Sequence, residues 1–150
     1  MDFSRYNNNL NDLKRDIEAA EENSKKFEEI IPGTYEISIE SLAVKETKSG
    51  DSLMLSVCMK ILDGKYKNRL IFFNQLLMTG FGIHKANEFL RSLDTGADIK
   101  FEDFIKYDEL VKEVEFTIKK MNLEYELEYS KTEKNGRTYD NYKITQVFEG

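Results

Sequence analysis

The stretch TYEISIESLAV, residues 34–44, changes the phase of its hydrophobic alternation halfway along. Its apolar residues fall first on odd positions, at Tyr35, Ile37 and Ile39, and then on even positions, at Leu42 and Val44. An extra residue near Ser41 accounts for this change as a β-bulge, which bends a strand sharply. Small barrels need such a strand because it serves both halves of the closed sheet. The stretch therefore predicts the bent first strand of a small β-barrel.

Two further strands are predicted after this one, each preceded by a turn. The turns are Lys48–Asp51 and Asp63–Lys65, which carry the glycine and small polar residues that turns favour. The second strand, Leu53–Ile61, alternates cleanly, whereas the third, Arg69–Leu77, is so apolar that its faces are hard to assign. The charge of Arg69 indicates which residues of the third strand face outward: Arg69, Ile71 and Phe73. Leu70 and Phe72 would then face the core.

The middle of the chain is predicted to return from helix to strand. A helical stripe after Gly80 and Gly82 consists of Ile83, Ala86, Leu90 and Leu93. Residues 94–107 are expected to be irregular, with Phe101, Phe104 and Ile105 as anchors and a short helical turn at Leu110 and Val111. Alternation at Val114, Phe116 and Ile118 then predicts a fourth strand.

The last part of the chain is predicted to be a hairpin. Leu123–Tyr129 alternates on the opposite parity, so the change near Met121 is either a tight hairpin or a bulge in one long strand. Asn135-Gly136 is the strongest hairpin signal in the chain, and Tyr139–Phe148 is the final strand.

This order of elements predicts a mainly β fold. Three meandering strands, a helix and a final hairpin make the order of the OB fold, a five-stranded, partly open Greek-key barrel. We expect an OB-fold-like β-barrel of five to six strands, with a helix between strands three and four and an extra N-terminal helix. The break at Pro32-Gly33 separates an N-terminal helical extension, residues 1–30, from an OB-fold domain, residues 31–150.

The extension has the spacing of an amphipathic helix. Its apolar residues are Leu10, Leu13, Ile17 and Ala20, three or four positions apart. Such a helix either packs on the domain or on a partner, or remains a partly frayed arm.

Composition narrows the classes of function. The 150 residues contain no apolar run long enough to cross a membrane, and the polar N-terminus lacks the core of a signal peptide, which predicts a cytoplasmic protein. One cysteine, Cys58, and one histidine, His84, are too few for a structural zinc site, so we expect no metal and no cofactor. Because no phosphate-binding loop, dinucleotide fingerprint or metalloprotease motif is present, we expect a binding protein and not an enzyme.

The charge is unevenly distributed along the chain. The net charge of −6 argues against a nucleic-acid partner, but residues 60–91 carry six basic and two acidic side chains. Residues 92–116, in contrast, carry three basic and eight acidic ones. In the basic part cations alternate with aromatic rings, as they do in proteins that hold single strands, where cations follow the backbone and rings stack on bases.

These features predict a site for single-stranded DNA. OB folds bind across strands two and three, between the loops of the first and the last hairpin, here Lys48–Asp51 and Lys131–Arg137. Phosphates would be contacted by seven cations: Lys45, Lys48, Lys60, Lys65, Lys67, Arg69 and Arg137. Bases would stack on three rings: Tyr66, Phe73 and Tyr139. A place in the core is an equally good interpretation for these rings, and the better one for Phe72.

Several motifs resemble those of a family of small phage and prophage proteins. They are IPGTYE (residues 31–36), VKETKSG (44–50), ILDGKYKNR (61–69) and KNGRTY (134–139). Members of that family are encoded in replication and recombination cassettes, and are often described as a domain of unknown function or as single-stranded-DNA-binding proteins. The resemblance covers residues 27–148 and implies an OB fold that binds single-stranded DNA during phage DNA replication or recombination.

The chain departs from this family in two places. The segment Met121–Glu133 is longer than expected between the fourth strand and the last hairpin, and the chain ends at Gly150 without the acidic tail that many such proteins use to recruit partners. The resemblance implies no defined set of binding residues.

Two hypotheses about function therefore stand side by side. The first is a sequence-tolerant binder of single-stranded DNA without catalysis. The second, motivated by the net charge, is a protein-interaction module of phage origin, which would contact a replication, recombination or host-defence protein through Asp94–Glu115 and the N-terminal helix. A homo-oligomer would lengthen a DNA track, but the sequence does not determine the oligomeric state, the site size or the preference for DNA over RNA.

Overall fold

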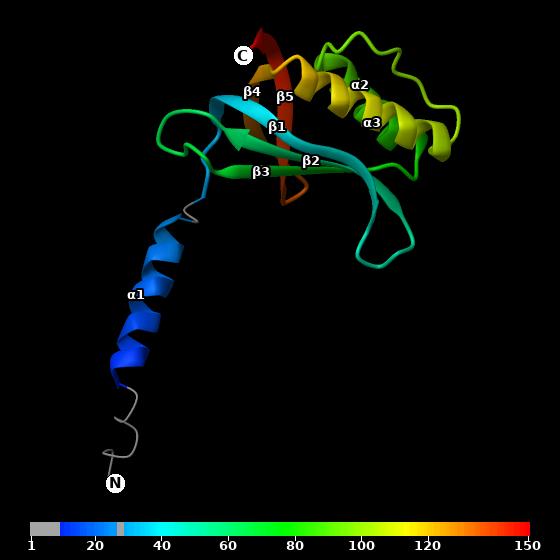
Figure 1. Cartoon of the computed structure of the whole chain (residues 1–150). Helices are drawn as coiled ribbons and strands as arrows, with labels where there is room; N and C mark the ends of the chain where they lie inside the picture. Colours follow the sequence, from blue (N-terminus) through cyan, green and yellow to red (C-terminus); the bar gives the residue numbers. More distant parts are fainter. Residues whose placement is uncertain (1–9, 27–28) are drawn as a thin grey trace. The chain divides into compact units, whose positions relative to one another are not determined.

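The computed structural model describes residues 10–26 and 29–150, and the chain divides into two units, Met1–Ile31 and Pro32–Gly150 (Figure 1). In the first unit α1 covers Leu10–Lys26, where the spacing predicts a helix. Its apolar side chains Leu10, Leu13 and Ile17 are exposed. None of the described helices is both long enough and apolar enough to span a membrane.

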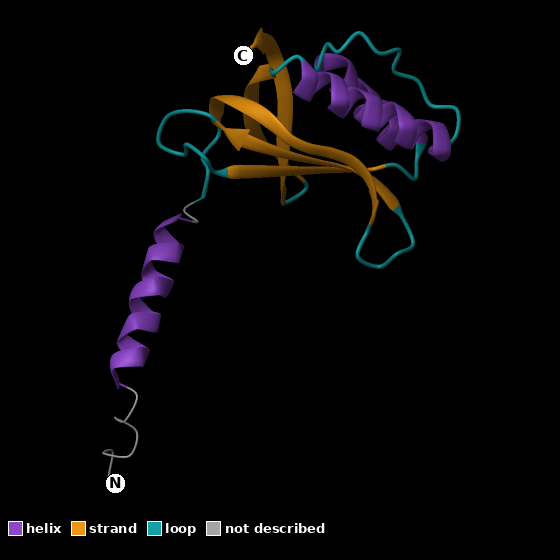
Figure 2. Cartoon of the chain, in the orientation of Figure 1, coloured by secondary structure: helices purple, strands orange, loops and turns teal. Residues whose placement is uncertain are grey.

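The second unit is built on one antiparallel sheet in the order β3-β2-β1-β4-β5 (Figure 2). The strands are β1 (Gly33–Glu46), β2 (Leu53–Ile61), β3 (Leu70–Leu76), β4 (Leu123–Lys134) and β5 (Arg137–Glu149). Two helices, α2 (Gly80–Ser92) and α3 (Phe104–Lys120), come between β3 and β4. The mainly β class is confirmed. The sheet of described strands is open, with β3 and β5 as its two edges.

β1 joins the two halves of the sheet. It pairs with β4 over Gly33–Ser38 and with β2 over Ile37–Glu46, and the register to β2 shifts between Ile39 and Ser41. The predicted bulge is confirmed at this position. Just beyond it, the amide of Leu42 donates a hydrogen bond of 2.6 Å to the Glu115 carboxylate of α3, so the bent strand is fastened to a helix.

The faces of β3 are the reverse of those predicted. Ile71 is buried, whereas Leu70 and Phe72 are exposed, Phe72 by 62%. The register explains this: Ile71 and Phe73 lie opposite Met59 and Val57, two fully buried residues of β2. Directly opposed residues of an antiparallel pair share a face. Arg69 precedes the strand, so its charge says nothing about the strand's faces.

Residues 104–120 form a helix where an irregular segment and a strand were expected, so that prediction is wrong. The buried residues of α3 are Tyr107, Val111, Val114 and Ile118, at helical spacing. Val114 and Ile118 are four positions apart. This spacing puts two residues on one face of a strand as well as on one face of a helix, which explains the wrong prediction. Ile105 is 76% and Phe116 65% exposed, so neither is a core anchor.

The change of parity near Met121 is the end of this helix. α3 ends at Lys120, and Asn122 takes a left-handed backbone conformation with φ of 50° before β4 begins at Leu123. The segment that seemed too long is therefore the fourth strand itself. The hairpin at Asn135-Gly136 is confirmed: both residues have positive φ, and Lys134 pairs with Arg137 across them, as in a two-residue type I′ turn.

The core lies between the inner face of the sheet and the two helices. Alternate residues of β2 and β4 are buried, including Leu55, Val57, Tyr125 and Leu127. Two tyrosine hydroxyls fix the helices: Tyr125 of β4 donates to the carbonyl of Leu93 at the end of α2 at 2.8 Å, and Tyr107 of α3 donates to the Asn87 amide oxygen of α2 at 2.7 Å. The other face of β1, β2 and β3 is turned away from the two helices.

Candidate nucleic-acid interface

The outer face of β1, β2 and β3 gathers residues from three strands. On β2 the outward positions are Met54, Ser56, Cys58 and Lys60, and their partners on β3 are Leu76, Asn74, Phe72 and Leu70. On β1 the partners of the first three are Lys45, Ala43 and Ser41. We call these eleven residues the outer face; five of them have small side chains (Ser41, Ala43, Ser56, Cys58 and Asn74), and the other six are one phenylalanine, one methionine, two leucines and two lysines.

Phe72 is the one aromatic ring of this outer face. It is 62% exposed and lies opposite Cys58, which in turn lies opposite Ser41. Small neighbours leave the flat side of a ring accessible, and an accessible ring is what a nucleobase can stack on. Of the two neighbouring phenylalanines of β3, it is therefore Phe72 and not Phe73 whose ring lies on the outer face.

Basic residues lie at both ends of the outer face. Lys45 is opposite Met54 at one end, with Lys48 in the adjoining turn. At the other end are Lys60, opposite Leu70, and the connection that carries Lys65, Lys67 and Arg69. Met54 and Lys60 are six positions apart on β2, which corresponds to about 20 Å of strand. Two of the seven predicted cations, Lys45 and Lys60, therefore lie on the outer face. Four more lie in the connections at its two ends: Lys48, Lys65, Lys67 and Arg69.

Lys60 shares its charge with an acid. Its ammonium lies 3.4 Å from the carboxylate of Glu40, and both side chains are partly exposed. Such an exposed pair is weak, so a phosphate can replace the carboxylate at little cost.

Tyr66 does not offer its ring to a base, and that assignment is wrong. The residue is only 5% exposed and packs edge-on against Tyr35, with ring centroids 6.0 Å apart. The ammonium of Lys65 lies 5.4 Å from the centre of the Tyr66 ring. Tyr66 therefore stabilises the β2–β3 connection that holds the cations.

The remaining predicted residues lie at the opposite edge of the sheet or face inward. Arg137 and Tyr139 are exposed residues of β5, the edge strand farthest from β3 in the sheet order. Phe73 faces inward and contacts Phe89 of α2 and Tyr142 of β5, at 5.1 and 5.5 Å between ring centroids. Phe73 and Tyr139 also line one cleft, of about 640 Å³, between β3, α2 and β5.

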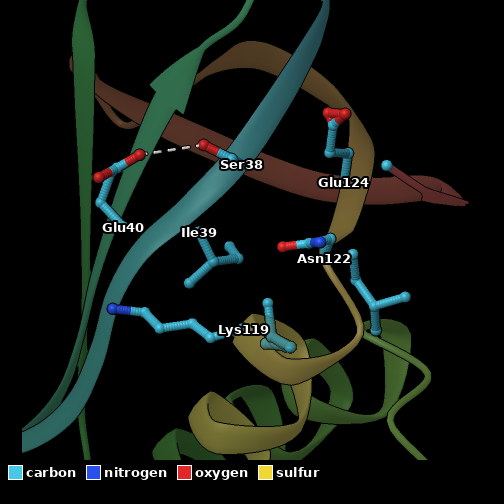
Figure 3. A pocket seen from close by; sticks show the side chains of 9 residues that line it. Ser38, Ile39, Glu40, Lys119, Asn122 and Glu124 are labelled. Atoms are coloured by element: carbon cyan, nitrogen blue, oxygen red, sulfur yellow. Dashed lines mark hydrogen bonds between the residues drawn. The ribbon is translucent and has the colours of Figure 1, made fainter.

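A second, more polar pocket of about 420 Å³ lies where the β1 bulge, the end of α3 and the start of β4 meet (Figure 3). In it the Ser38 hydroxyl donates to Glu40 at 3.1 Å. None of the predicted DNA-binding residues lines this pocket. Among the described residues, no cluster of histidine, cysteine and carboxylate side chains has the arrangement of a metal site.

Cys58 is a half-buried thiol on the outer face. Burial, and secondarily the nearby Glu40 carboxylate, raise the pKa of Cys58. The thiol therefore stays protonated and unreactive at neutral pH.

The rest of the sheet's outer surface is acidic. Glu36 on β1 lies opposite Glu126 on β4, with Glu124 and Glu128 two positions to either side. The acidic stretch expected to contact a protein is different in character, because its lysines pair with its own acids: Lys100 with Asp98, Lys106 with Glu102, and Lys112 with Asp108. Most of these acids therefore lie outside the outer face, although Glu40 pairs with Lys60 at one of its ends.

The sequence missed Phe72 and the α2 ring Phe81, which is 70% exposed. The alternation of β2 shows which of its residues face outward. Once the register between β2 and β3 is known, it also shows that Phe72 faces outward. The register depends on the connection Leu62–Arg69, whose geometry no local pattern reports. No local pattern distinguished Phe81: it lies 5.5 Å from Lys85, four residues later, but Phe116 has the same arrangement with Lys120.

Comparison with known proteins places the chain in a group without an assigned activity. A family model described as "Protein of unknown function (DUF669)" matches residues 16–148. A search of curated proteins found no significant match.

Proposed function

The chain belongs to the DUF669 family, and we propose that it is a sequence-tolerant single-stranded-DNA-binding protein with an OB fold. Its place of action would be phage or prophage DNA replication or recombination in the cytoplasm. Single-stranded DNA is the proposed ligand, and phage or host replication and recombination proteins are proposed partners. The proposal includes no cofactor and no catalytic step.

The arrangement of the strands supports an OB fold. A bent β1 that pairs with both β2 and β4 is what a five-stranded Greek-key barrel requires. The two edge strands approach each other through side chains, since Phe73 of β3 touches Tyr142 of β5 at 5.5 Å. A barrel left open at this seam is within the range of OB folds, which are only partly closed.

The observation that carries the function is the exposed Phe72 ring between two groups of lysines. A strand lying across the outer face would place a base on Phe72, with phosphates near Lys45 and Lys48 on one side and Lys60 and Lys67 on the other. Stacking tolerates any base, and lysine contacts to phosphate carry no sequence information. Binding would therefore depend on salt and on single-strandedness, and little on sequence.

One observation favours a protein-interaction module as the second candidate. Ile105 and Phe116, both on the solvent face of α3, are 76% and 65% exposed. Large exposed apolar side chains mark contact surfaces when they cluster. These two are eleven positions apart, so they do not form a continuous patch, and we rank this candidate below DNA binding.

The test is a fluorescence-anisotropy titration of a labelled oligo(dT) of about 30 nucleotides, a length that covers at least one OB footprint. We expect tight binding that weakens with salt, and much weaker binding to a duplex of the same length. Absence of binding to the oligonucleotide at low salt contradicts the proposal and leaves the protein-interaction module.

The same titration locates the site. Phe72→Ala should weaken oligo(dT) binding by about 1–3 kcal/mol, the contribution of one stacked base. Phe116→Ala is the matched control because its ring is exposed to a similar degree on α3, away from the outer face. Equal affinities of the two variants would refute the assignment of Phe72 while leaving DNA binding itself intact.

A further inference from the structure

An aromatic cleft lies between the two edge strands of the sheet, β3 and β5, and helix α2. It shares no residue with the outer face. Its volume is about 640 Å³, within the range of roughly 300–1,000 Å³ that holds small ligands. Phe73, Phe89 and Tyr142 form its floor, with centroid distances of 5.1 and 5.5 Å from Phe73 to the other two. These rings are packed against one another and belong to the fold.

Two further aromatic residues line the cleft and are exposed to solvent. Phe81, from the first turn of α2, is 70% exposed, and Tyr139, from β5, is 48% exposed. They come from different elements and add nothing to the packing of the core. Rings in such positions are suited to holding a flat ligand by stacking.

The polar groups of the cleft suit a neutral ligand. Lys85 and Lys143 line it together with Glu88 and Asp140, so positive and negative charges balance. Lys85 lies 3.7 Å from Glu88 and 5.5 Å from the centre of the Phe81 ring. Neither a phosphate nor a charged peptide is favoured by this balance, whereas a nucleobase carries no charge.

The cleft is continuous with the outer face through β3. Side chains alternate along a strand, so Phe72 and Asn74 point to the outer face while Phe73 and Gln75 point to the cleft. Because β3 is an edge strand, no further strand separates the two surfaces. A DNA strand that crosses this edge passes directly from one to the other.

We propose that the cleft binds one nucleobase of the single strand that lies on the outer face, turned over the edge of β3 and held by Phe81 and Tyr139. This inference rests on the proposed DNA-binding function. If the cleft binds a base, part of the affinity for single-stranded DNA comes from this base, in addition to the one stacked on Phe72.

The test compares two strands of equal length, oligo(dT) and the same sugar–phosphate strand without bases. Phe81→Ala and Tyr139→Ala should each weaken binding of oligo(dT) about tenfold, as expected for one stacked base, and leave binding of the abasic strand unchanged. The matched control is Phe116→Ala, since Phe116 is also an exposed helical ring with a lysine four residues later, 5.9 Å from its centre. It should change neither affinity.

A second readout reports contact directly. Oligo(dT) carrying 5-iodo-deoxyuridine is irradiated on the wild-type protein, and the cross-linked residues are identified by mass spectrometry. Cross-links at Phe81 or Tyr139 support the proposal. Cross-links confined to the outer face, together with unchanged oligo(dT) affinity of both cleft variants, overturn it and leave the cleft to a protein partner.

The failures of the two proposals are distinguishable. If wild-type protein does not bind oligo(dT), the proposed function fails and this inference fails with it. If wild-type protein binds and Phe72→Ala weakens binding while the cleft variants do not, only the cleft proposal fails. Equal loss of affinity for oligo(dT) and the abasic strand in Phe81→Ala also overturns it, because the contact would then be to the backbone.

Discussion

Gly82 lies where helix α2 passes closest to the end of β3. Its amide donates to the hydroxyl of Thr79, the N-cap residue, at 2.9 Å. A methyl group built on Gly82 would come within 2.2 Å of the backbone carbonyl oxygen of Leu76, which belongs to the strand and cannot move aside without disturbing the sheet. The close approach, and not a special backbone angle, requires glycine here.

We therefore predict that Gly82→Ala lowers the free energy of unfolding by about 1–3 kcal/mol, the usual cost of overpacking. The control is Gly80→Ala, two residues earlier in the same helix, where a methyl group has nothing within 4 Å. Urea denaturation followed by circular dichroism measures both. Equal stability of the two variants would contradict the close approach of α2 to β3.

Cys58 offers a test of the DNA site without any substitution. It is the single cysteine of the chain and lies opposite Phe72 on the outer face. Because burial raises the pKa of Cys58, alkylation by iodoacetamide should be slow at neutral pH and faster at alkaline pH. Saturating oligo(dT) should slow the alkylation further, and duplex DNA of equal length should not. A rate that stays constant as oligo(dT) saturates the protein would place the DNA elsewhere.

Among the elements, α3 and β1 are joined by one carboxylate. Glu115 accepts a hydrogen bond from the backbone amide of Leu42 at 2.6 Å, two positions past the bulge. Leu42 is only 1% exposed, so its amide has no access to water if the acceptor is removed. An unsatisfied buried donor is costly.

We expect Glu115→Ala to lower the free energy of unfolding by roughly 1–3 kcal/mol, and Glu115→Gln, which keeps an acceptor oxygen, to lose less. Glu113→Ala, on the exposed side of the same helix, is the control and should be close to wild type. The measurement is thermal or urea unfolding of the three variants. Comparable losses in all of them would mean that the removed negative charge, and not the contact with β1, is responsible.

Elements whose determinants are local were predicted well. The bulge of β1 was visible as a change of parity, β2 as an uninterrupted alternation, and the last hairpin as Asn135-Gly136. α3 was missed because its buried residues include Val114 and Ile118, whose β-branched side chains favour strands in isolation. Residues 104–120 form a helix and not a strand because they pack against β1. That contact joins segments about seventy residues apart in the chain.

For the whole molecule, buried tyrosines link stability to alkaline pH. Burial raises the pKa of Tyr107 from 10.0 to about 12. Burial, followed by the hydrogen bond to Asp140, raises the pKa of Tyr129 from 10.0 to about 12. In the unfolded chain both would titrate near their usual value. The folded state therefore holds these two protons more tightly than the unfolded state does.

The folded state is therefore less stable at alkaline pH. Stability is complete below about pH 10 and should fall as the pH rises from about 10 to 12, by about 1.4 kcal/mol per pH unit for each tyrosine. Urea unfolding at a series of alkaline pH values measures it, and Tyr107→Phe should reduce the slope. A free energy of unfolding that stays level up to about pH 11 would show that these hydroxyls are not held in the fold as described.

The sequence by itself determined the mainly β class, the bulged first strand, the turns and the basic character of the β2–β3 connection. Each of these is encoded by residues that are neighbours in the chain, through the period of alternation, the chemistry of turns and local charge. They sufficed to name six of the cations that flank the outer face.

Only the tertiary structure decided which rings face solvent. The sequence favoured the core for Phe72 and left Phe73 and Tyr66 evenly divided between surface and core. The register of β3 against β2 places Phe72 on the outer face and Phe73 on the inner one. Whether a ring stacks on a base or packs in a core depends on what lies over it, and that is supplied by distant segments such as β1 and α2. A one-residue change of register exchanges every face of a strand, so the aromatic part of the site could not be read from local pattern.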